Sequence, residues 1–395
     1  MKIALVCQYY PPNRTSQAVQ MRDLAVGLKK LGHDIFVAVP SEYPTSKSCN
    51  VDSDGISVLR IPSLKITNVN FVKRAFGELF MPFIMLRAIR GSNFPSKELD
   101  LIVWYSPSIF FGPVVSYLKK KSSCKGYLIL RDMFPEWLAD VGVMKKRFAY
   151  YFFKMVAIYQ YGLADVIGVQ SESNLSYFDG RNANQRGTVE VLENWLNSKD
   201  GQIPCPEYLT KDLLEKKIIV YTGNMGVPQG MDILIHLADF LKNRDDIHFL
   251  FVGRGTEKKR LETLVFNMNL YNVSFYDEID SSAIQDLLKK CSLGLIALHP
   301  KHKSHNIPGK FLSYLASGLP VLARINKGTD LEKLINFNKL GFAYTGDSVE
   351  QFAAKAIELI DDDTALGETA RRGKSFFLNT YSVEKATKQI TRILN

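Results

Sequence analysis

The sequence predicts an α/β protein made of two doubly wound domains that face each other across a cleft. Short apolar runs of strand length alternate with amphipathic runs of helix length, and the alternation occurs in both halves of the chain. A chain of 395 residues is too long for one compact core. A polar stretch around Gly201, Pro204 and Pro206 separates the halves. We place the first domain at 1–195, a linker at 196–215, the second domain at 216–380 and a C-terminal helix at 381–395.

The first half opens with a strand–helix–strand unit. Residues 2–7 form a short apolar run, residues 15–31 have apolar side chains at helical spacing, and Gly32 ends that helix before a strand at 35–39. This order is typical of a parallel sheet covered on both faces, where ligands bind beyond the carboxyl end of the first strand. Further strands are expected at 55–61, 101–105, 127–131, 165–171 and 187–192.

The second half repeats the pattern. A strand at 217–222 leads into a tight glycine loop at 223–226, and a helix follows at 230–241. Further strands are expected at 247–252, 273–276, 293–297, 321–323 and 342–344. Helices are expected before 268 and at 281–291, 349–360, 365–379 and 383–394.

A loop, a helix, a turn and a strand follow one another in the middle of the second half. Pro308 and Gly309 open the helix, Gly318 ends it, and Pro320 blocks its continuation. The unpaired N–H groups and partial positive charge of a helix start attract phosphate, and Lys310 adds a full charge in the first turn. The alternative, for this stretch alone, is a well-capped core helix.

The composition argues against several classes of protein. The chain is 46% hydrophobic and 23% charged, which is typical of a globular protein. Its five cysteines have no regular spacing and no CxxC pair, so we expect reduced cytosolic thiols rather than disulfides or a zinc site. The first apolar run is too short for a signal-peptide core. The longest apolar segment, 148–169, contains Lys154, Gln160 and Asp165, which argues against a transmembrane helix.

The net charge of +10 is concentrated in one region. Between Arg60 and Lys154 the chain has 16 basic and six acidic residues, so this region carries the whole excess. It requires an anionic partner, and nucleic acid, an anionic membrane surface and a phosphate-bearing substrate are the alternatives. No known nucleic-acid recognition motif accompanies the charge, so no nucleic-acid partner is predicted.

Residues 71–90 mix large apolar and basic side chains, as in a helix that lies on an anionic membrane. Basic triplets at 119–121 and 145–147 could widen the contact. The alternative is an ordinary packed helix with a solvated basic edge. The membrane-contact residues that we predict are Phe71, Lys73, Arg74, Phe76, Phe80, Phe83, Arg87 and Arg90.

Short motifs occur in order along nearly the whole chain. They are Tyr9-Tyr10-Pro11-Pro12, Gly32-His33, the run from Arg131 to Trp137, the loop from Tyr221 to Gly226 with Gln229-Gly230, the turn from Phe251 to Gly255, and the stretch from Ile307 to Phe311 with Pro320-Val321. Together they resemble the family-4 glycosyltransferases of the GT-B fold. More narrowly, they resemble bacterial transferases that use an activated L-fucosamine-type sugar (L-FucNAc) in O-antigen or capsule assembly.

The resemblance implies two Rossmann-like domains, with the C-terminal helix returning to the N-terminal domain. It implies a hexosyltransferase that retains anomeric configuration by front-face attack within an ion pair, without a covalent enzyme intermediate. The second half would bind a uridine diphosphate (UDP) sugar. The first half would bind an acceptor sugar on undecaprenyl diphosphate, at the cytoplasmic face of the inner membrane, in O-antigen, capsule or lipopolysaccharide biosynthesis. It implies no metal and no cofactor.

The resemblance and the chemistry of the motifs together give a candidate donor site. Gly226 lets a backbone N–H approach a phosphate, and Arg254 and Lys310 supply positive charge to a leaving diphosphate. Tyr276 lies where the family seats the base. The predicted donor-binding residues are Gly223, Asn224, Gly226, Gln229, Arg254, Tyr276, His305, Pro308, Gly309, Lys310 and Ser313.

The sequence departs from the family pattern at three places. The family usually has two glutamates eight positions apart around the helix start, and this chain has His305 and Ser313 there. A basic residue often follows the glycine loop, where this chain has Gln229. A glycine pair is expected after the first strand, and its place is taken by a polar loop in the N-terminal domain that consists of Thr15, Ser16 and Gln17.

Two carboxylates of the first half are the predicted catalytic residues. Asp132 and Glu136 follow a buried strand and face the predicted cleft, where one could accept or orient the proton of the acceptor hydroxyl. The alternative is that both cap a helix beginning near Pro135. The run Asp361-Asp362-Asp363 resembles a metal-binding motif, but it lies between two helices, so we expect a solvated turn and a helix cap and no metal.

Two other functions fit the same residues. A nucleotide-sugar 2-epimerase has the same fold, but such enzymes usually carry more carboxylates in the cleft and no basic apolar segment. A degenerate, non-catalytic binding subunit would account for Ser313 and Gln229 at positions where the family has charged residues.

Overall fold

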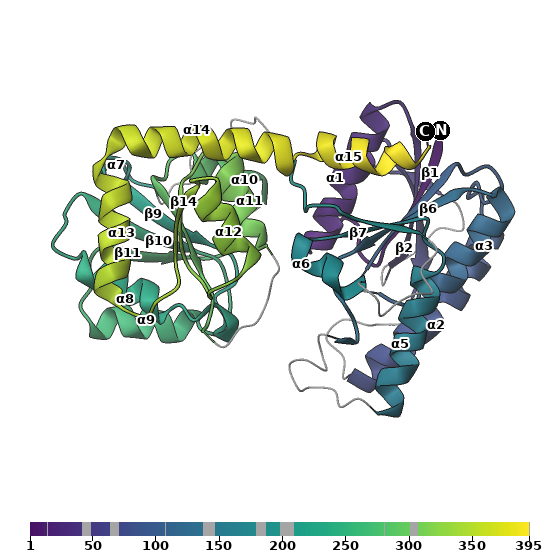
Figure 1. The fold of residues 1–395 in the computed structure, drawn as a ribbon, viewed down its shortest axis with the longest axis horizontal. Helices are drawn as coiled ribbons and strands as arrows, with labels where there is room; N and C mark the ends of the chain where they lie inside the picture. The colour runs from purple at the N-terminus through teal and green to yellow at the C-terminus, as the bar shows by residue number, and fades with distance from the viewer. Residues whose placement is uncertain are drawn as a thin grey trace. The chain divides into compact units, whose positions relative to one another are not determined.

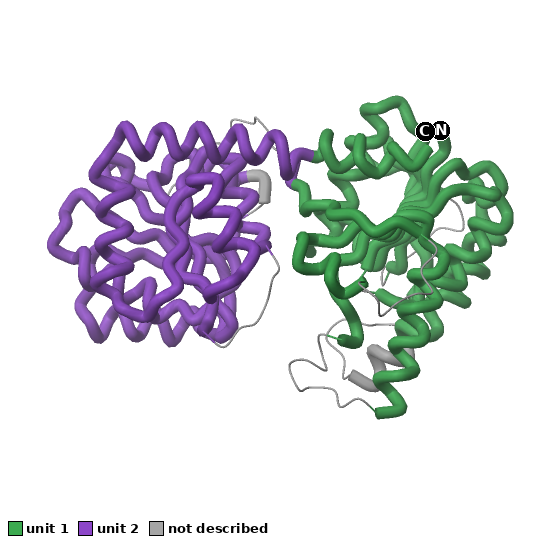
Figure 2. The backbone as a smooth tube through the Cα atoms, viewed as in Figure 1, with its two compact units in different colours: residues 1–195, 383–395 green, residues 196–382 purple. Residues whose placement is uncertain are grey.

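The computed structural model describes two compact units (Figure 2). One consists of Met1–Trp195 with Val383–Asn395, and the other of Leu196–Ser382. The structure describes residues 1–13, 15–41, 49–63, 71–106, 108–136, 147–178, 187–197, 209–279, 281–300 and 307–394, with the side chains of 71–76, 281 and 282 outside that description.

Unit 1 contains an eight-stranded sheet in the order β3-β4-β2-β1-β5-β6-β7-β8 (Figure 1). All neighbours are parallel except β3 and β4. The strands are β1 (Lys2–Val6), β2 (Asp34–Ser41), β3 (Asn50–Val51), β4 (Ser57–Pro62), β5 (Leu101–Tyr105), β6 (Lys125–Leu130), β7 (Val166–Val169) and β8 (Thr188–Val191).

Helices cover both faces of this sheet. Side chains of α2, α3 and α5 share one core with one face of the strands, whereas α1 and the C-terminal α15 share the other core. The helix α15 therefore belongs to unit 1, although the chain reaches it through unit 2. The helices of unit 1 are α1 (Ser16–Lys30), α2 (Phe71–Arg90), α3 (Gly112–Ser122), α5 (Phe148–Tyr161), α6 (Glu172–Leu175), η1 (Ser176–Phe178), α15 (Val383–Thr391) and η3 (Arg392–Leu394).

Unit 2 contains a six-stranded, wholly parallel sheet in the order β11-β10-β9-β12-β13-β14. The strands are β9 (Lys217–Thr222), β10 (Ile247–Val252), β11 (Val273–Tyr276), β12 (Leu293–Ala297), β13 (Val321–Arg324) and β14 (Gly341–Tyr344). The helices are α7 (Lys211–Leu214), η2 (Val227–Gln229), α8 (Asp232–Phe240), α9 (Lys258–Asn267), α10 (Ser281–Leu288), α11 (Gly309–Ala316), α12 (Asp330–Phe337), α13 (Val349–Asp361) and α14 (Asp363–Thr380).

These sheets confirm the predicted fold class of two doubly wound α/β domains. In unit 1 the strand order reverses beside β1, and in unit 2 it reverses beside β9. In open parallel sheets, ligands bind beyond the carboxyl ends of strands at such a reversal. A functional site is therefore expected at the loops after β1 and β9.

Candidate functional site

The glycine loop after β9 packs backbone to backbone against the loop after β10. A Cβ atom on Gly253 would lie 2.0 Å from the carbonyl oxygen of Gly223, so a larger residue is excluded at the contact. Gly223 itself has φ +109°, a conformation that favours glycine. The N–H of Met225 donates to the carbonyl of Arg254 at 2.7 Å. The two loops therefore form one rigid edge of unit 2.

Gln229 fixes the shape of the glycine loop. Its Oε1 accepts hydrogen bonds from the N–H of Gly226 at 3.0 Å and from the side-chain amide of Asn224 at 3.3 Å. The backbone N–H of Gly226, which the sequence assigns to a phosphate, therefore already has a partner. In the structure Gln229, the last residue of η2, braces the glycine loop.

A hollow of about 600 Å³ opens beside this loop. Arg254 reaches its rim with a guanidinium that is 79% exposed and pairs with Glu278 at 3.1 Å. An exposed ion pair of this kind is weak, so the arginine can exchange its partner for an anionic ligand. The residues that line the hollow are Asn224, Gly226, Val227, Pro228, Arg254, Gly255 and Thr256.

The helix α11 begins at the same edge of unit 2. Pro308 precedes it without a side-chain cap, and Gly309 is exposed with open space around its Cα. Tyr314 anchors the helix, since its hydroxyl donates to the carbonyl of Leu295 at 3.0 Å and accepts from the N–H of Thr222 at 3.1 Å. The uncapped helix start is thereby held beside β9, with N–H groups available to an anion.

Lys310 brings a positive charge to this edge. Its Nζ lies 3.3 Å from the ring centre of Tyr221, and a Cβ on Gly223 would lie 3.9 Å from it. Burial holds the pKa of the Lys310 ammonium well below its ordinary value. In the described part of the chain, no carboxylate pairs with this ammonium, and the aromatic ring is its only recorded partner. The structure thus brings Gly223 and Lys310 together, although 87 positions separate them in the sequence.

Polar residues also end the central strands of unit 1. Gln8 follows β1, Ser106 follows β5 and Asp132 follows β6, and these three strands are neighbours in the sheet. The hydroxyl of Ser106 is buried without a partner among the described residues. Burial raises the pKa of Asp132, which the nearby Arg131 partly offsets. Sequence reasoning missed Gln8 and Ser106, although each is a polar residue directly beyond a buried apolar strand.

Glu136 is held by α5. Its Oε1 lies 3.4 Å from both the hydroxyl of Tyr150 and the ammonium of Lys154. Its Oε2 is buried and has no partner among the described residues. Residues 137–146, which would form the helix capped by Asp132 and Glu136, lie outside the described part of the chain. The capping role therefore stays a prediction.

The loop predicted at Thr15, Ser16 and Gln17 is wrong, because these residues form the cap and the first turn of α1. Thr15 caps α1, with its Oγ1 accepting the N–H of Ala18 at 3.4 Å, and Ser16 begins the helix. The side chain of Gln17 is buried, and neither its oxygen nor its nitrogen has a partner among the described residues. A buried amide without partners is costly unless water or a ligand completes its hydrogen bonds.

A comparison with known proteins places similar sequences at this site. The model of the family "Glycosyl transferases group 1" matches residues 216–362, which include the glycine loop, the hollow and α11. Unit 2 of this chain is therefore similar to that family.

Two curated relatives are similar over most of the chain. This chain is 23% identical over 353 residues to "Probable glycosyltransferase WbjE" of Pseudomonas aeruginosa, covering 86% of this chain and 85% of that one. It is 25% identical over 294 residues to "Putative colanic acid biosynthesis glycosyl transferase WcaI" of Escherichia coli K12, covering 69% and 70%.

Solved structures confirm the GT-B fold. Sucrose-phosphate synthase from Thermosynechococcus elongatus superposes with a TM-score of 0.73 at 15% identity, covering 99% of this chain and 98% of that one. WaaG, a glycosyltransferase involved in lipopolysaccharide biosynthesis, has a TM-score of 0.66 at 14% identity, covering 100% and 99%. Anabaena Alr3699/HepE, solved with UDP and glucose, has a TM-score of 0.67 at 15% identity, covering 100% and 99%.

The remaining predicted donor residues have different positions in unit 2. The carbonyl of Tyr276, at the end of β11, accepts the N–H of Gly253 at 3.1 Å, so this residue joins the same edge. The hydroxyl of Ser313 donates to the carbonyl of Gly309 at 3.4 Å within its own helix. His305 lies outside the described residues.

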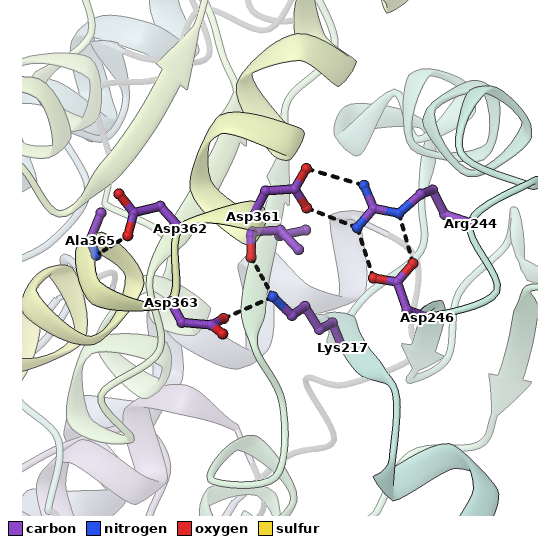
Figure 3. Close-up of polar contacts among 8 residues, drawn as sticks. Lys217, Arg244, Asp246, Asp361, Asp362, Asp363 and Ala365 are labelled. Atoms are coloured by element: carbon purple, nitrogen blue, oxygen red, sulfur yellow. Dashed lines mark hydrogen bonds and ion pairs between the residues drawn. The ribbon is translucent and has the colours of Figure 1, made fainter.

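The acidic run at 361–363 forms a turn and a cap, as the sequence predicts (Figure 3). The side chain of Asp362 accepts the N–H of Ala365 at 2.9 Å and so caps α14. Asp361 pairs with Arg244 at 2.8 Å, which lowers the pKa of that carboxyl, and Asp363 pairs with Lys217 at 2.8 Å. Within the described residues, no group of three or more His, Cys, Asp or Glu side chains could hold a metal.

The predicted membrane segment is the helix α2. It buries Met81, Met85 and Ile89 in the core of unit 1 and exposes Phe80 and Phe83. Arg87 and Arg90 are also exposed, with Arg90 over the ring of Tyr117. The side chains of Phe71, Lys73, Arg74 and Phe76 lie outside the described residues. None of the described helices is long and apolar enough to span a membrane.

Proposed function

We propose that this chain is a glycosyltransferase that moves an amino- or deoxyhexose, such as L-FucNAc, from a UDP-sugar to a sugar on undecaprenyl diphosphate. Anomeric configuration is retained, and the product enters an O-antigen or capsule polysaccharide. The observation that carries the proposal is the ammonium of Lys310, which faces the glycine loop at the start of α11 and has no acidic partner in the described part of the chain.

The chemistry of the donor follows from this edge of unit 2. A buried ammonium without a counter-ion is unfavourable, so the site gains free energy when a diphosphate supplies the missing negative charge. The N-terminal N–H groups of α11 add donors, and Arg254 is available at the rim. The same charges stabilise the diphosphate when it leaves the sugar in the transition state.

The names of the relatives support the assignment to polysaccharide assembly. WcaI is described as a colanic acid biosynthesis transferase, WaaG acts in lipopolysaccharide biosynthesis, and Alr3699/HepE has been solved with UDP and UDP-glucose. We extend to this chain the UDP-sugar of Alr3699/HepE as the class of donor, and the biosynthetic roles of WcaI and WaaG as the class of product.

Unit 1 supplies the groups proposed for the acceptor. Asp132 is half-buried at the carboxyl end of β6, and Glu136 has a buried carboxylate oxygen that no described residue contacts through a hydrogen bond. Either can accept a hydrogen bond from the acceptor hydroxyl and direct its lone pair at the anomeric carbon. With retention by front-face attack, the departing phosphate oxygen can take the hydroxyl proton, so these carboxylates orient the acceptor and no covalent sugar–enzyme bond forms.

Calorimetric titration with UDP tests the donor half of the proposal. We expect Lys310→Met to weaken UDP binding by about 30- to 100-fold, because one charge-assisted contact in a dry site is lost. Lys333→Met is the matched control, since Lys333 on α12 is largely exposed and should leave UDP binding unchanged. Wild-type protein that fails to bind UDP would contradict the proposal and favour a degenerate, non-catalytic subunit.

The transfer reaction is tested with lipid-linked acceptor and a panel of UDP-sugars. We expect one donor to be consumed only when acceptor is present, with the anomeric configuration of the product read by nuclear magnetic resonance. Formation of an epimer from UDP-N-acetylglucosamine without acceptor would instead identify a 2-epimerase.

A further inference from the structure

One carboxylate continues the buried side of α2. Met81, Met85 and Ile89 of this helix lie in the core of unit 1 and follow one another at helical spacing. Glu78 lies one turn before Met81 on the same side and is only partly exposed. It is also the only acidic residue in the sequence of 71–90. A charged group on the core-facing side of a helix loses hydration, so its position requires a partner or a function.

Gln8 brings this carboxylate to the carboxyl edge of the sheet. Gln8 lies two residues beyond β1, is only 2% exposed, and donates from its side-chain amide to Oε1 of Glu78 at 3.4 Å. The strand order of unit 1 reverses beside β1, which is where open parallel sheets bind ligands. Glu78 therefore lies at the position of unit 1 where a ligand is expected, and not deep in the core.

The ends of two further strands extend this polar edge. Val6 of β1 pairs with Trp104 of β5, so Gln8 and Ser106 continue these strands at the same level. Ser106 is fully buried, and its hydroxyl has no partner among the described residues. Asp132 follows the next strand, β6. At roughly 4.8 Å between neighbouring strands, about 10 Å separates β1 from β6. Glu78, Gln8, Ser106 and Asp132 are called the polar row below.

We propose that the polar row binds the acceptor sugar, with Glu78 accepting a hydrogen bond from a second hydroxyl while Asp132 meets the hydroxyl that reacts. The inference rests on the proposed transfer reaction and adds to it the recognition of the acceptor. A carboxylate forms a charge-assisted hydrogen bond with a hydroxyl but cannot donate one. The acceptor is therefore a sugar with a free hydroxyl remote from the reacting one, and a deoxy, methylated or acylated carbon at that position is disfavoured.

Gln8 is a positioning residue in this arrangement. Its buried amide fixes the direction of the Glu78 carboxylate, and because the amide is neutral, the carboxylate keeps its negative charge for the sugar. A contact to a hydroxyl weakens steeply when its geometry is poor, so loss of the amide should weaken acceptor binding indirectly. The alternative is that Gln8 and Glu78 form a structural contact only, and kinetics with modified acceptors separate the two roles.

Steady-state kinetics with synthetic acceptors test the inference. The probes are polyprenyl diphosphates that carry N-acetylglucosamine, N-acetylgalactosamine or glucose, each with analogues that lack one hydroxyl. With the acceptor used best, Glu78→Gln should raise the acceptor KM about tenfold and change kcat little, because the contact is the same in the ground state and the transition state. Asp132→Asn should instead lower kcat, since it meets the reacting hydroxyl.

The analogues identify the hydroxyl that Glu78 binds. One analogue should raise the KM of the wild type about tenfold but raise that of Glu78→Gln no further, because both changes remove the same hydrogen bond. The other analogues should affect both proteins equally. Gln8→Met should show the same pattern more weakly. A structural role alone would leave the effects of substitution and analogue additive at every hydroxyl.

Glu98→Gln is the matched control. Glu98 belongs to the same unit but pairs with Lys2 at the amino end of β1, away from the polar row, so its acceptor KM should stay normal. Calorimetry should show normal UDP binding for every variant. A wild-type KM in Glu78→Gln, or additive effects for every analogue, would overturn this inference and leave the transfer reaction intact. Wild-type protein that binds UDP but uses none of the probes would contradict the proposed acceptor, and this inference with it.

Discussion

Each unit of this protein has a cation beside an aromatic ring at the carboxyl edge of its sheet, and the two cations differ in their acceptors. In unit 1, Arg131 lies 5.3 Å from the ring of Trp195 and donates to the carbonyls of Leu192 and Glu193 at 2.5 and 3.2 Å, while its Nε has no partner among the described residues. In unit 2, Lys310 lies over Tyr221 and has no hydrogen-bond acceptor or carboxylate among the described residues. Arg131, the anchored cation, ties two segments of unit 1 together, whereas Lys310, the unanchored cation, is available to a ligand.

The difference teaches that burial alone does not mark a functional charge. Burial lowers the pKa of both groups, yet Arg131 stays charged because a guanidinium does not deprotonate in proteins. Its two carbonyl partners tie the end of β6 to the segment after β8. Hydrogen bonds to backbone carbonyls, and not depth, distinguish the anchored Arg131 from Lys310.

The largest effect on stability is expected at Arg131. Arg131→Met should lower the free energy of unfolding by about 3 kcal/mol or more, because two buried carbonyls lose their donors and the ring contacts are lost. Urea denaturation measures this loss. Arg87→Met, on the exposed part of α2, is the control and should change the free energy of unfolding little. UDP affinity of the folded Arg131 variant should be normal, and a selective loss of UDP binding would reverse the two roles.

The neighbour of Arg131 should separate catalysis from stability. Asp132→Asn should reduce the transfer rate by about 100-fold or more, because the carboxylate proposed to orient the acceptor hydroxyl is lost while its shape is kept. UDP binding should not change, since the proposed donor residues belong to unit 2. Steady-state rates with saturating donor measure the effect. A normal rate would transfer the role to Glu136, for which Glu136→Gln is the parallel variant.

The sequence predicts the fold well because the relevant signals are local. Pro308, Gly309 and Gly318 mark the start and end of α11, and the apolar runs give the parallel strands. Even the acidic turn follows from the position of Asp362 before a helix. Such features depend on a few neighbouring residues, so composition and spacing suffice.

The partners of the site residues are not local, and the sequence cannot assign them. Whether Lys310 meets Tyr221 or a carboxylate depends on the register of α11 against β9, which Tyr314 sets. Gln229 is predicted to contact the donor, and its hydrogen bond to the N–H of Gly226, which braces the glycine loop, depends on a fold of the loop that the sequence does not specify. The exposed side of α5 cannot be predicted from the sequence either. Apolar residues lie on several sides of this helix, and packing decides that Phe148, Tyr151 and Met155 stay exposed.

The unanchored Lys310 should also make stability and UDP binding depend on pH. Burial lowers the pKa of Lys310 below its ordinary value of 10.5, so between those two pKa values the unfolded chain binds more protons than the ligand-free protein. The free energy of unfolding should therefore rise with pH through that window. A bound diphosphate restores the proton, so UDP binding should take up protons there.

Calorimetry in buffers of different ionisation enthalpy measures this uptake. Lys310→Met should abolish both the uptake and its share of the pH dependence, whereas Lys333→Met should keep both. Release of protons on UDP binding in wild-type protein would contradict the assigned direction of the Lys310 pKa shift.

The smallest effect is expected at Ser313, where the pattern that the sequence resembles has a glutamate. Ser313→Glu places a carboxylate one turn after the start of α11, where the present hydroxyl only bonds to Gly309. The new group can accept hydrogen bonds from the ribose, but at a spacing of three residues it can also pair with Lys310 and end its isolation. We expect UDP affinity to rise by about three- to tenfold, and proton uptake to shrink because the ion pair raises the pKa of Lys310. Ser313→Gln is the uncharged control, which should keep the proton uptake. A fall in UDP affinity in the glutamate variant alone would mean that the cost of the Glu–Lys pair exceeds the gain from the ribose contact. An unpaired Lys310 would then contribute more to UDP binding than a hydrogen bond to the ribose.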